Sequence, residues 1–500
     1  MKINKILIAN RGEIALRILR ACNEMNIRSA SIYSDIDRTS LHVLYAEEAY
    51  PVGAAPSSES YLRIDKIIDV AKIAGVDAIH PGYGFLSENA EFAKAVEDNE
   101  MIFIGPSPEA INLLGDKTKA KALASSCGVD SVPGSDKPIE SLESALEIAE
   151  EIGFPVLLKA ASGGGGKGMR IVNDSSAMEK MLRSASSEAE SSFGDPSVFI
   201  EKYLSRPHHI EFQILADAHG NVVHLGDREC SVQRRYQKVI EESPSPFITD
   251  EVRSKMGENA VEIVKAATYI GAGTVEFLVN SKMEYYFLEV NTRLQVEHTI
   301  TEMRTGIDIV KEQIRLAEGN ELSFTQEDIR FTGHAIECRI TSEDTSNDFL
   351  PTTGRITSLI EPGGPGIRID SGVRQGSEMT AYYDPLMSKL VAWGKDRAES
   401  IARSDRALSE YVISGLPTSI PFCKKVLNHK DFLEGDYDTS LSDSLLKNNA
   451  SADLDSEHIA AAIGATTHKI DSKPKNFSNG SSANGHSSLW KRSGRESSLR

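Results

Sequence analysis

The sequence predicts an α/β (α+β) protein with several domains. Its 500 residues are 40% hydrophobic and 26% charged, which is the composition of a globular chain long enough for two to four domains. Strand-like and helix-like segments alternate from residue 5 to residue 105, and alternating strands dominate from about 205 to 446. The first pattern is typical of a sheet with crossover helices, and the second indicates a strand-rich region.

The charge and the hydropathy pattern exclude several classes of protein. A formal net charge of −18 argues against nucleic acid or an anionic membrane as the main partner. The chain has no run of 18 apolar residues, and residues 1–9 lead into a strand and not into a signal peptide. The cysteines are odd in number and scattered, without a C-x-x-C pair, so neither a disulfide framework nor a zinc site is indicated. We therefore expect a cytoplasmic protein without a membrane partner.

The first 114 residues read as a Rossmann-like domain. Residues 5–9 form a predicted strand, residues 13–22 have helical spacing and residues 29–33 form a second strand, which together make a β-α-β unit. The turn between them, Asn10-Arg11-Gly12-Glu13, lacks the G-x-G-x-x-G pattern that seats a dinucleotide pyrophosphate. The domain is therefore expected to bind no NAD.

A glycine-rich loop lies in the second region, about 130 to 204. Residues 155–160 and 169–172 read as strands on either side of it. A Walker loop is excluded, because Ala161 stands where its first glycine belongs and Gly168 where its hydroxyl belongs. The pattern predicts a flexible flap whose amides could contact a polyphosphate. A hairpin tip without a ligand is the alternative.

Two glutamates are predicted to face each other on paired strands. Residues 274–280 and 285–291 read as strands joined by a four-residue loop, with residue 276 opposite 289, 278 opposite 287 and 280 opposite 285. Like charges placed opposite on a sheet are destabilising, so Glu276 and Glu289 should share a cation. With Asn291 on the same face, the pair suits Mg²⁺ or Mn²⁺. An exposed sheet face with solvated glutamates is the alternative.

The segment after these strands adds groups for anion binding and proton transfer. Arg293, Gln295, Glu297 and His298 supply a guanidinium, an amide and a candidate general base close to the predicted metal site. Three lysines could add point charges for phosphates or another anion. Lys117 opens a predicted helix, Lys159 ends the strand before the glycines, and Lys238 lies in a basic run that on its own would read as a solvated face.

These residues resemble the biotin carboxylases, members of the ATP-grasp superfamily. The resemblance covers residues 1–446 and rests on the strings KILIANRGEIALRI, IHPGYGFLSENAEFA, GDK, KAASGGGGKGM, QRRYQKVIEE, FLEVNTRLQVEHTITE and HAIECRI. It implies a Rossmann-like N-terminal domain at 1–114, an ATP-grasp domain at 115–330 with a mobile lid at about 131–204, and a biotin carboxylase C-terminal domain at 331–446. The Ser-, Asn- and Gly-rich composition of residues 447–500 predicts a disordered tail.

The resemblance implies a role for each candidate residue. The ATP contacts are Lys117, Lys159, His209 and Gln233, with Glu201 and Lys202 near the adenine and Gly164, Gly165 and Gly166 in the flap that closes over the nucleotide. The metal ligands, for two ions of Mg²⁺ or Mn²⁺, are Glu276, Glu289 and Asn291. The bicarbonate pocket is formed by Lys238, Arg293, Gln295 and Val296.

The resemblance also implies a mechanism. Glu297 removes the proton of bicarbonate, whose oxygen then attacks the γ-phosphate of ATP to give carboxyphosphate. Carboxyphosphate breaks into CO₂ and phosphate, and the phosphate deprotonates biotin while Arg339 steadies the enolate-like oxygen. Closure of the lid would keep water away from carboxyphosphate.

The sequence also predicts partners. No A-M-K-M motif of a biotin-carrying domain follows residue 446, and residues 177–181 (AMEKM) have an extra Glu and lie in a predicted helix. We expect a free-standing biotin carboxylase subunit of an acetyl-CoA or propionyl-CoA carboxylase, which needs a biotin carboxyl carrier protein and a carboxyltransferase. Family precedent favours a homodimer.

One departure and two alternatives are left. Tyr236 stands where bacterial relatives often carry histidine, which puts a nucleotide-side contact in doubt. Another ATP-grasp enzyme, such as a carboxylate-amine ligase, would share the nucleotide half but would not need, in this form, the set Lys238, Arg293, Gln295, Glu297 and Arg339. A regulatory protein that binds nucleotide without catalysis is the second alternative, and the intact Glu297 and both predicted metal carboxylates argue against it.

Overall fold

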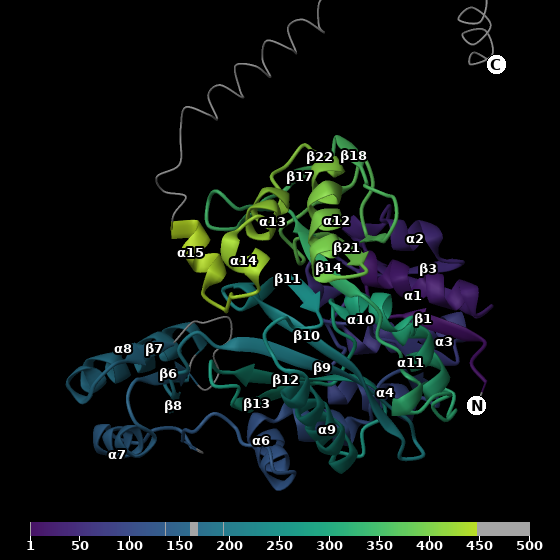
Figure 1. Ribbon diagram of the computed structural model, residues 1–500. Coiled ribbons are helices and arrows are strands. Elements are labelled where there is room, and N and C mark those ends of the chain that lie inside the picture. The colour runs from purple at the N-terminus through teal and green to yellow at the C-terminus, as the bar shows by residue number, and fades with distance from the viewer. Residues whose placement is uncertain (1, 136, 161–168, 194, 448–500) are drawn as a thin grey trace, which may run out of the picture. The chain divides into compact units, whose positions relative to one another are not determined.

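The N-terminal residues of the computed structural model form a parallel sheet, as the β-α-β pattern predicts (Figure 1). The structure describes residues 2–135, 137–160, 169–193 and 195–447. The strand order is β3-β2-β1-β4-β5, and every pair is parallel. The strands are β1 (Lys5–Ile8), β2 (Arg28–Ser34), β3 (Glu48–Gly53), β4 (Ala78–His80) and β5 (Ile102–Phe103). The helices of this region are α1 (Gly12–Glu24), α2 (Leu41–Tyr45), α3 (Ile64–Ala74), α4 (Ala90–Asp98) and α5 (Pro108–Gly115), with short 3₁₀ turns at η1 (Asp35–Asp37) and η2 (Ser57–Glu59).

The turn after β1 holds a neighbouring loop through side-chain hydrogen bonds. Asn10 Nδ2 donates hydrogen bonds to the carbonyls of Pro81 at 2.7 Å and Tyr83 at 2.8 Å. Gly12 opens α1 with a φ of +68°, a conformation that glycine adopts without steric cost. The turn therefore fixes the loop that follows β4, since both loops leave the same edge of the parallel sheet.

The region predicted as a lid contains a small antiparallel sheet, β7-β6-β8, covered by two helices (Figure 1). Its elements are α7 (Leu142–Ile152), β6 (Val156–Ala160), β7 (Arg170–Val172), α8 (Ser175–Phe193) and β8 (Val198–Lys202), and α6 (Lys117–Ser126) precedes them. The strands before and after the glycine loop pair with each other, which confirms the predicted strand-loop-strand arrangement. The predicted flap residues Gly164, Gly165 and Gly166 and the tail from residue 448 onward lie outside the described residues.

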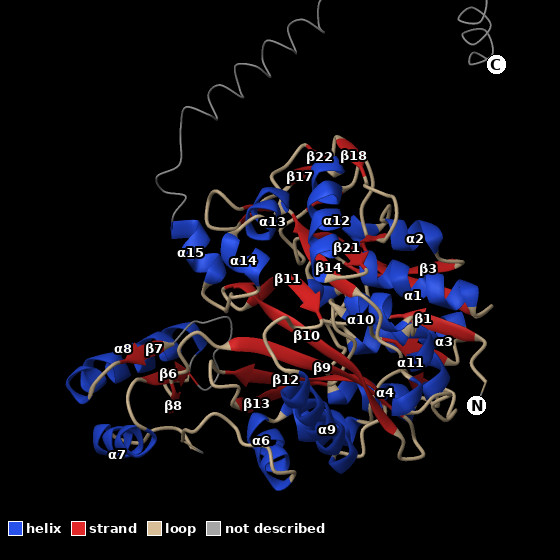
Figure 2. Ribbon diagram, viewed as in Figure 1, coloured by secondary structure: helices blue, strands red, loops and turns tan. Residues whose placement is uncertain are grey.

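An eight-stranded antiparallel sheet carries the candidate site (Figure 2). Its order is β13 (Tyr285–Asn291), β12 (Gly271–Val279), β9 (His208–Ala216), β10 (Val222–Arg234), β11 (Gln237–Ser243), β14 (His334–Thr341), β21 (Leu386–Gly394) and β19 (Ile367–Ser371). The sheet crosses residue 330, because β11 pairs directly with β14. The predicted domain boundaries stay predictions.

The register between β12 and β13 confirms one predicted pair and corrects two. Glu276 pairs with Glu289, as predicted. A β-bulge follows, so that Leu278 pairs with Tyr286 and residue 279 with residue 285, and the predicted pairs 278 with 287 and 280 with 285 are wrong. The cause is one extra residue, Leu288, on β13, which period-2 alternation cannot reveal.

Strand β9 shows why one face of this sheet is polar although the strand is fully buried. Ile210, Phe212 and Ile214 share a core cluster with apolar residues of α9 (Asp250–Ala266), including Met256 and Ala260. The alternate positions 209, 211 and 213 are His, Glu and Gln, and their side chains point to the opposite face. The helix side of the sheet therefore supplies apolar burial, and the other side supplies the site.

The remaining elements surround this sheet. The helices are α10 (His298–Thr305), α11 (Ile309–Ala317), α12 (Arg397–Glu410), α13 (Ile420–Leu427), α14 (Lys430–Glu434) and α15 (Leu441–Lys447), with a 3₁₀ turn at η3 (Gln326–Asp328). Short strands are β15 (Glu343–Asp344), β16 (Leu350–Pro351), β17 (Gly354–Arg355), β18 (Ser358–Ile360), β20 (Glu378–Met379) and β22 (Val412–Ser414). Among the described residues, none of the helices has the length and hydropathy needed to span a bilayer.

Candidate active site

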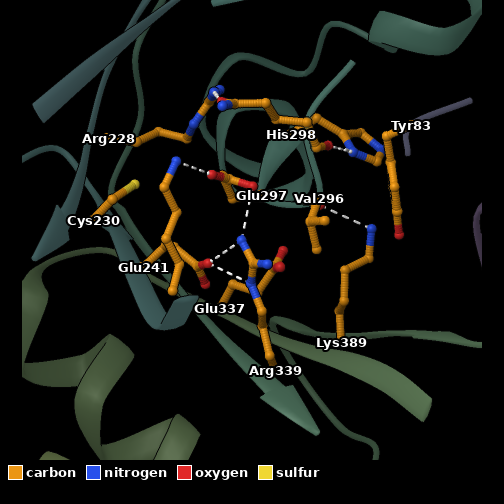
Figure 3. Close-up of polar contacts among 12 residues, drawn as sticks. Tyr83, Arg228, Cys230, Glu241, Val296, Glu297, His298, Glu337, Arg339 and Lys389 are labelled. Atoms are coloured by element: carbon orange, nitrogen blue, oxygen red, sulfur yellow. Dashed lines mark hydrogen bonds and ion pairs between the residues drawn. The ribbon is translucent and has the colours of Figure 1, made fainter. Parts of the chain in front are cut away.

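The carboxylate of Glu297 is held between two cations (Figure 3). Lys238 Nζ on β11 donates to Glu297 Oε1 at 2.6 Å, and Arg339 Nη2 on β14 donates to Glu297 Oε2 at 3.0 Å. Glu297 is the N-cap residue of α10, but its side chain makes no capping hydrogen bond. The turn before α10 therefore places the backbone of Glu297 and leaves its carboxylate to the site.

The charges around Glu297 explain its ionisation. Burial acts to raise the pKa of Glu297, but the nearby charges of Lys238, Arg339 and Arg228 lower this pKa far below its usual range. Burial acts to lower the pKa of Lys238, and its carboxylate neighbours raise this pKa well above the usual value. The resting site therefore holds an ionised carboxylate and a protonated amine.

Lys238 connects Glu297 to two further carboxylates. Its Nζ lies 2.5 Å from Glu211 Oε2 and 3.0 Å from Glu276 Oε1. The alternative for this lysine taken alone, a solvated face, does not apply, because β11 turns its side chain into the buried polar face of the sheet. A buried ammonium is tolerable only among such partners.

Glu276 collects hydrogen bonds from several predicted site residues. His209 Nε2 lies 2.8 Å from Glu276 Oε2, and Gln295 Nε2 and Asn291 Nδ2 donate to Glu276 Oε1 at 2.7 and 2.9 Å. Burial acts to raise the pKa of Glu276, but Lys238 and His209 lower this pKa well below its ordinary value. Gln233 joins the group through His209, since its Nε2 lies 2.7 Å from His209 Nδ1.

Glu289 and Glu276 fit a divalent cation. They are directly opposite on neighbouring strands, and burial together with the charge of Glu276 raises the pKa of Glu289. Within the described part of the chain, no hydrogen bond reaches the Glu289 carboxylate. Two facing carboxylates are suited to Mg²⁺ or Mn²⁺, and a bound cation would replace some of the hydrogen bonds that now reach Glu276. The Asn291 carbonyl oxygen, the third predicted ligand, accepts from Arg293 Nη2 at 3.0 Å.

Arg293 is oriented by a loop of the N-terminal region. Its Nε donates to Glu88 Oε2 at 2.9 Å, while Glu88 Oε1 accepts from the backbone N–H of Thr292 at 3.1 Å. Gln295 is fixed by Arg228, whose Nη2 donates to Gln295 Oε1 at 2.7 Å. The guanidinium and the amide predicted from the sequence therefore lie beside Glu276 and Asn291.

Among the residues that the structure describes, no hydrogen bond or ion pair joins the predicted nucleotide contacts on the lid to this cluster. Lys159 forms an ion pair with Glu201, and Lys121 of α6 donates to the other oxygen of Glu201 at 2.9 Å. Lys202 Nζ donates to the carbonyls of Gly153 at 2.7 Å and Phe154 at 3.2 Å. Lys117 is exposed at the start of α6, as the sequence predicts.

Several residues of the site were missed by sequence reasoning. Arg228 is fully buried and donates to Glu211 Oε1 at 2.5 Å and to Gln213 Oε1 at 2.7 Å. Glu241 accepts from Arg339 Nε at 2.6 Å. A signal was present in the strand at 208–216, where polar residues alternate with apolar ones. For Glu88 and Glu241, no local pattern distinguishes them from surface glutamates.

Comparison with known proteins identifies the family. Three family models match consecutive parts of the chain: the biotin carboxylase N-terminal domain at residues 2–111, the ATP binding domain of the carbamoyl-phosphate synthase L chain at 116–325, and the biotin carboxylase C-terminal domain at 337–444. A biotin carboxylase of a Nostoc species is 52% identical over 447 residues, which cover 89% of this chain and all of that protein. The chain belongs to the biotin carboxylase family.

A further relative and a solved structure support the same family assignment. Biotin carboxylase 1 of Bacillus subtilis is 50% identical over 438 residues, which cover 87% of this chain and 97% of that protein. The crystal structure of the biotin carboxylase domain dimer of Hydrogenobacter thermophilus 2-oxoglutarate carboxylase, with MgADP, ADP and bicarbonate, matches with a TM-score of 0.85 and 45% identity over 91% of this chain and all of that chain. The predicted ATP-grasp fold and the ATP-dependent carboxylation of biotin by a ligase are confirmed.

Proposed function

We propose that this chain carboxylates biotin on a separate carrier protein, with Glu297 as the base that removes the bicarbonate proton. One observation carries the assignment: the Glu297 carboxylate lies between Lys238 and Arg339, the two cations that an anionic substrate and a developing oxyanion would need. An acid ligase for another substrate would need the phosphate half of the site but not this pair.

The ion pairs suggest how Glu297 becomes a useful base. In the resting site, Lys238 and Arg339 hold its pKa low, so it is a weak proton acceptor. Bicarbonate at Lys238 and the biotin ureido oxygen at Arg339 would take over these hydrogen bonds. With its cations occupied, Glu297 would gain proton affinity when the substrates are in place.

The reaction then proceeds between the substrates. The bicarbonate O–H proton passes to Glu297, and the freed oxygen attacks the γ-phosphorus as the bond to ADP breaks. Carboxyphosphate formed in this way splits into CO₂ and phosphate, and the phosphate takes the ureido N–H proton. The nitrogen then bonds to CO₂, while Arg339 stabilises the negative oxygen.

The nucleotide and the metal ion would bind next to the bicarbonate pocket, on the same polar face of the eight-stranded sheet. Glu276, Glu289 and Asn291 would hold Mg²⁺ or Mn²⁺, which supplies positive charge against the phosphates when bound. Lys117, Lys159, His209 and Gln233 would contact the nucleotide, with Glu201 and Lys202 at the adenine. Lys159 would exchange its Glu201 partner for a phosphate.

The proposal includes partner chains. A biotinylated carrier protein would present the ureido ring, and a carboxyltransferase would consume the carboxybiotin. The dimer of the related Hydrogenobacter domain supports a homodimer for this chain as well.

The test is ADP release from ATP with Mg²⁺, bicarbonate and free biotin. We expect turnover that requires bicarbonate, rises with biotin and falls at least roughly 100-fold in Glu297→Gln. The exposed Glu47→Gln variant is the matched control and should behave as wild type. ATP binding without bicarbonate-dependent turnover would favour the nucleotide-binding regulatory protein.

A further inference from the structure

A fully buried lysine lies behind the proposed base, on the strand next to Arg339. Lys389 on β21 is directly opposite Arg339 on β14 and has no exposed surface. Its Nζ donates to the backbone carbonyl of Val296 at 3.0 Å (Figure 3). Resting on the proposed function, we propose that Lys389 is a positioning residue that fixes the Val296–Glu297 peptide and thereby aims the Glu297 carboxylate.

The surroundings of Lys389 join three parts of the chain. Glu13, at the start of α1, lies 3.2 Å from Nζ, and Asp370 on β19 lies 4.0 Å from it. The hydroxyl of Tyr83 contacts Glu13, and the Tyr83 ring centroid lies 5.9 Å from Nζ. The ammonium is therefore anchored by the N-terminal region and the C-terminal strands, while its remaining donor reaches the site loop.

The hydrogen bond to the Val296 carbonyl acts on Glu297 through the peptide bond that joins the two residues. The Val296 C=O and the Glu297 N–H belong to a single planar peptide, so fixing the carbonyl fixes the orientation of that plane and the position of the Glu297 Cα, from which the side chain leaves the backbone. Glu297 has no capping hydrogen bond of its own to do this. Displacement of a catalytic group by about 1 Å can cost roughly 100-fold in rate.

A different role is open to a buried lysine, namely to balance the charges of Glu13 and Asp370 without affecting the site. The two roles make different demands. Charge balance needs the ammonium near Glu13, whereas positioning needs the hydrogen bond to Val296. Removing the Glu13 charge tests the Lys389–Glu13 contact alone, because Lys389 and its hydrogen bond to the Val296 carbonyl stay in place.

The experiment compares Lys389→Met/Glu13→Gln with Glu13→Gln. The double variant removes the donor and its counter-charge together, so that no unpaired carboxylate is left at Glu13. We expect kcat/KM for bicarbonate to fall roughly 10- to 100-fold in the double variant and to stay within about threefold of wild type in Glu13→Gln. The KM for MgATP should be unchanged in both. Lys389→Gln/Glu13→Gln, whose shorter amide cannot span to Val296, replaces the methionine variant if that protein does not fold.

A readout independent of activity accompanies the kinetics. Hydrogen exchange of the amides in residues 294–300 should be faster in the double variant and unchanged in Glu13→Gln. Equal kinetics and equal exchange in both variants would overturn the positioning role. Absence of bicarbonate-dependent turnover in the wild type would overturn the proposed function instead, and the exchange data would still decide whether Lys389 holds the loop.

Discussion

At the scale of single residues, the site is a set of buried charged side chains, each of which is paired with a side chain of opposite charge. Lys238 lies within 3.0 Å of oxygens from Glu211, Glu276 and Glu297, all of them buried. Removing one partner of a buried ion pair costs several kcal/mol of stability, because the remaining charge is neither paired nor solvated. Such an arrangement is costly for a fold, which supports the proposal that an anionic substrate competes for the same cation.

Lys238→Gln is expected to damage both activity and stability. In the proposed site, bicarbonate would lose its cation and Glu297 would lose one of its two cationic partners, so kcat/KM for bicarbonate should fall at least roughly 100-fold. The free energy of unfolding should fall by about 3–5 kcal/mol, since several carboxylates lose their partner. Denaturant unfolding and ADP release measure the two effects. Lys94→Gln, which removes an exposed helix ion pair, is the control and should change neither.

Glu88→Gln isolates the orientation of Arg293. Glu88 accepts hydrogen bonds from both Arg293 Nε and the Thr292 N–H. A glutamine at this position binds the Arg293 guanidinium more weakly, so the guanidinium should become less well oriented while the protein stays folded. We expect the KM for bicarbonate to rise about 10-fold, with the KM for ATP and the unfolding midpoint unchanged. An unaltered KM for bicarbonate would show that Arg293 does not need this partner.

Glu289→Gln tests the facing carboxylates as a metal site. Burial and the charge of Glu276 raise the pKa of Glu289, and the variant removes the charge that both disfavour, so the apoprotein should be equally stable or slightly more stable. The concentration of Mg²⁺ needed for half-maximal ADP release should rise at least roughly 10-fold. A gain in stability without a changed Mg²⁺ requirement would argue against Glu289 as a ligand.

At the scale of elements, Glu242 ties β11 to the helices that follow β21. Its carboxylate lies 2.6 Å from His334 Nε2 and accepts from Arg397 Nε at 2.7 Å. Burial acts to raise the pKa of Glu242, but hydrogen bonds and charges from His334 and Arg397 lower this pKa to about 2. An ordinary glutamate titrates near 4.5.

This lowered pKa predicts how stability depends on pH. Because the folded-state pKa lies below the unfolded one, the contribution of Glu242 is complete above about pH 4.5 and is lost as the pH falls towards 2. The loss is on the order of 3 kcal/mol. In Glu242→Gln, the slope of unfolding free energy against pH should be shallower between pH 4.5 and pH 2. An unchanged slope would contradict the assignment.

The elements also show what sequence could and could not predict. The β-α-β unit, the strands around the glycine loop and the Glu276–Glu289 pair depend on short-range patterns, and the structure has them. The bulge at Leu288 was not predictable, since one extra residue leaves no signature in alternation. Lys238, Glu88 and Lys389 acquire their surroundings from segments far away in the chain. Glu88 and Arg293, for example, are 205 residues apart.

At the scale of the whole molecule, one continuous sheet explains why distant motifs form one site. Strands on both sides of residue 330 present polar side chains on the same sheet, from Glu289 on β13 to Lys389 on β21. Glu88 and Glu13 of the N-terminal region reach this face through Arg293 and Lys389. Bicarbonate chemistry and nucleotide binding would therefore be coupled by a shared set of carboxylates around Lys238.

The most direct test of this account is transfer of labelled bicarbonate to biotin. The full chain is incubated with ATP, Mg²⁺, ¹⁴C-bicarbonate and a biotinylated carrier protein, and acid-labile label on the carrier is measured beside ADP. We predict label in proportion to ADP, none without ATP, and none above background with Glu297→Gln. ADP released without label on biotin, or an equally active Glu297→Gln, would contradict the account.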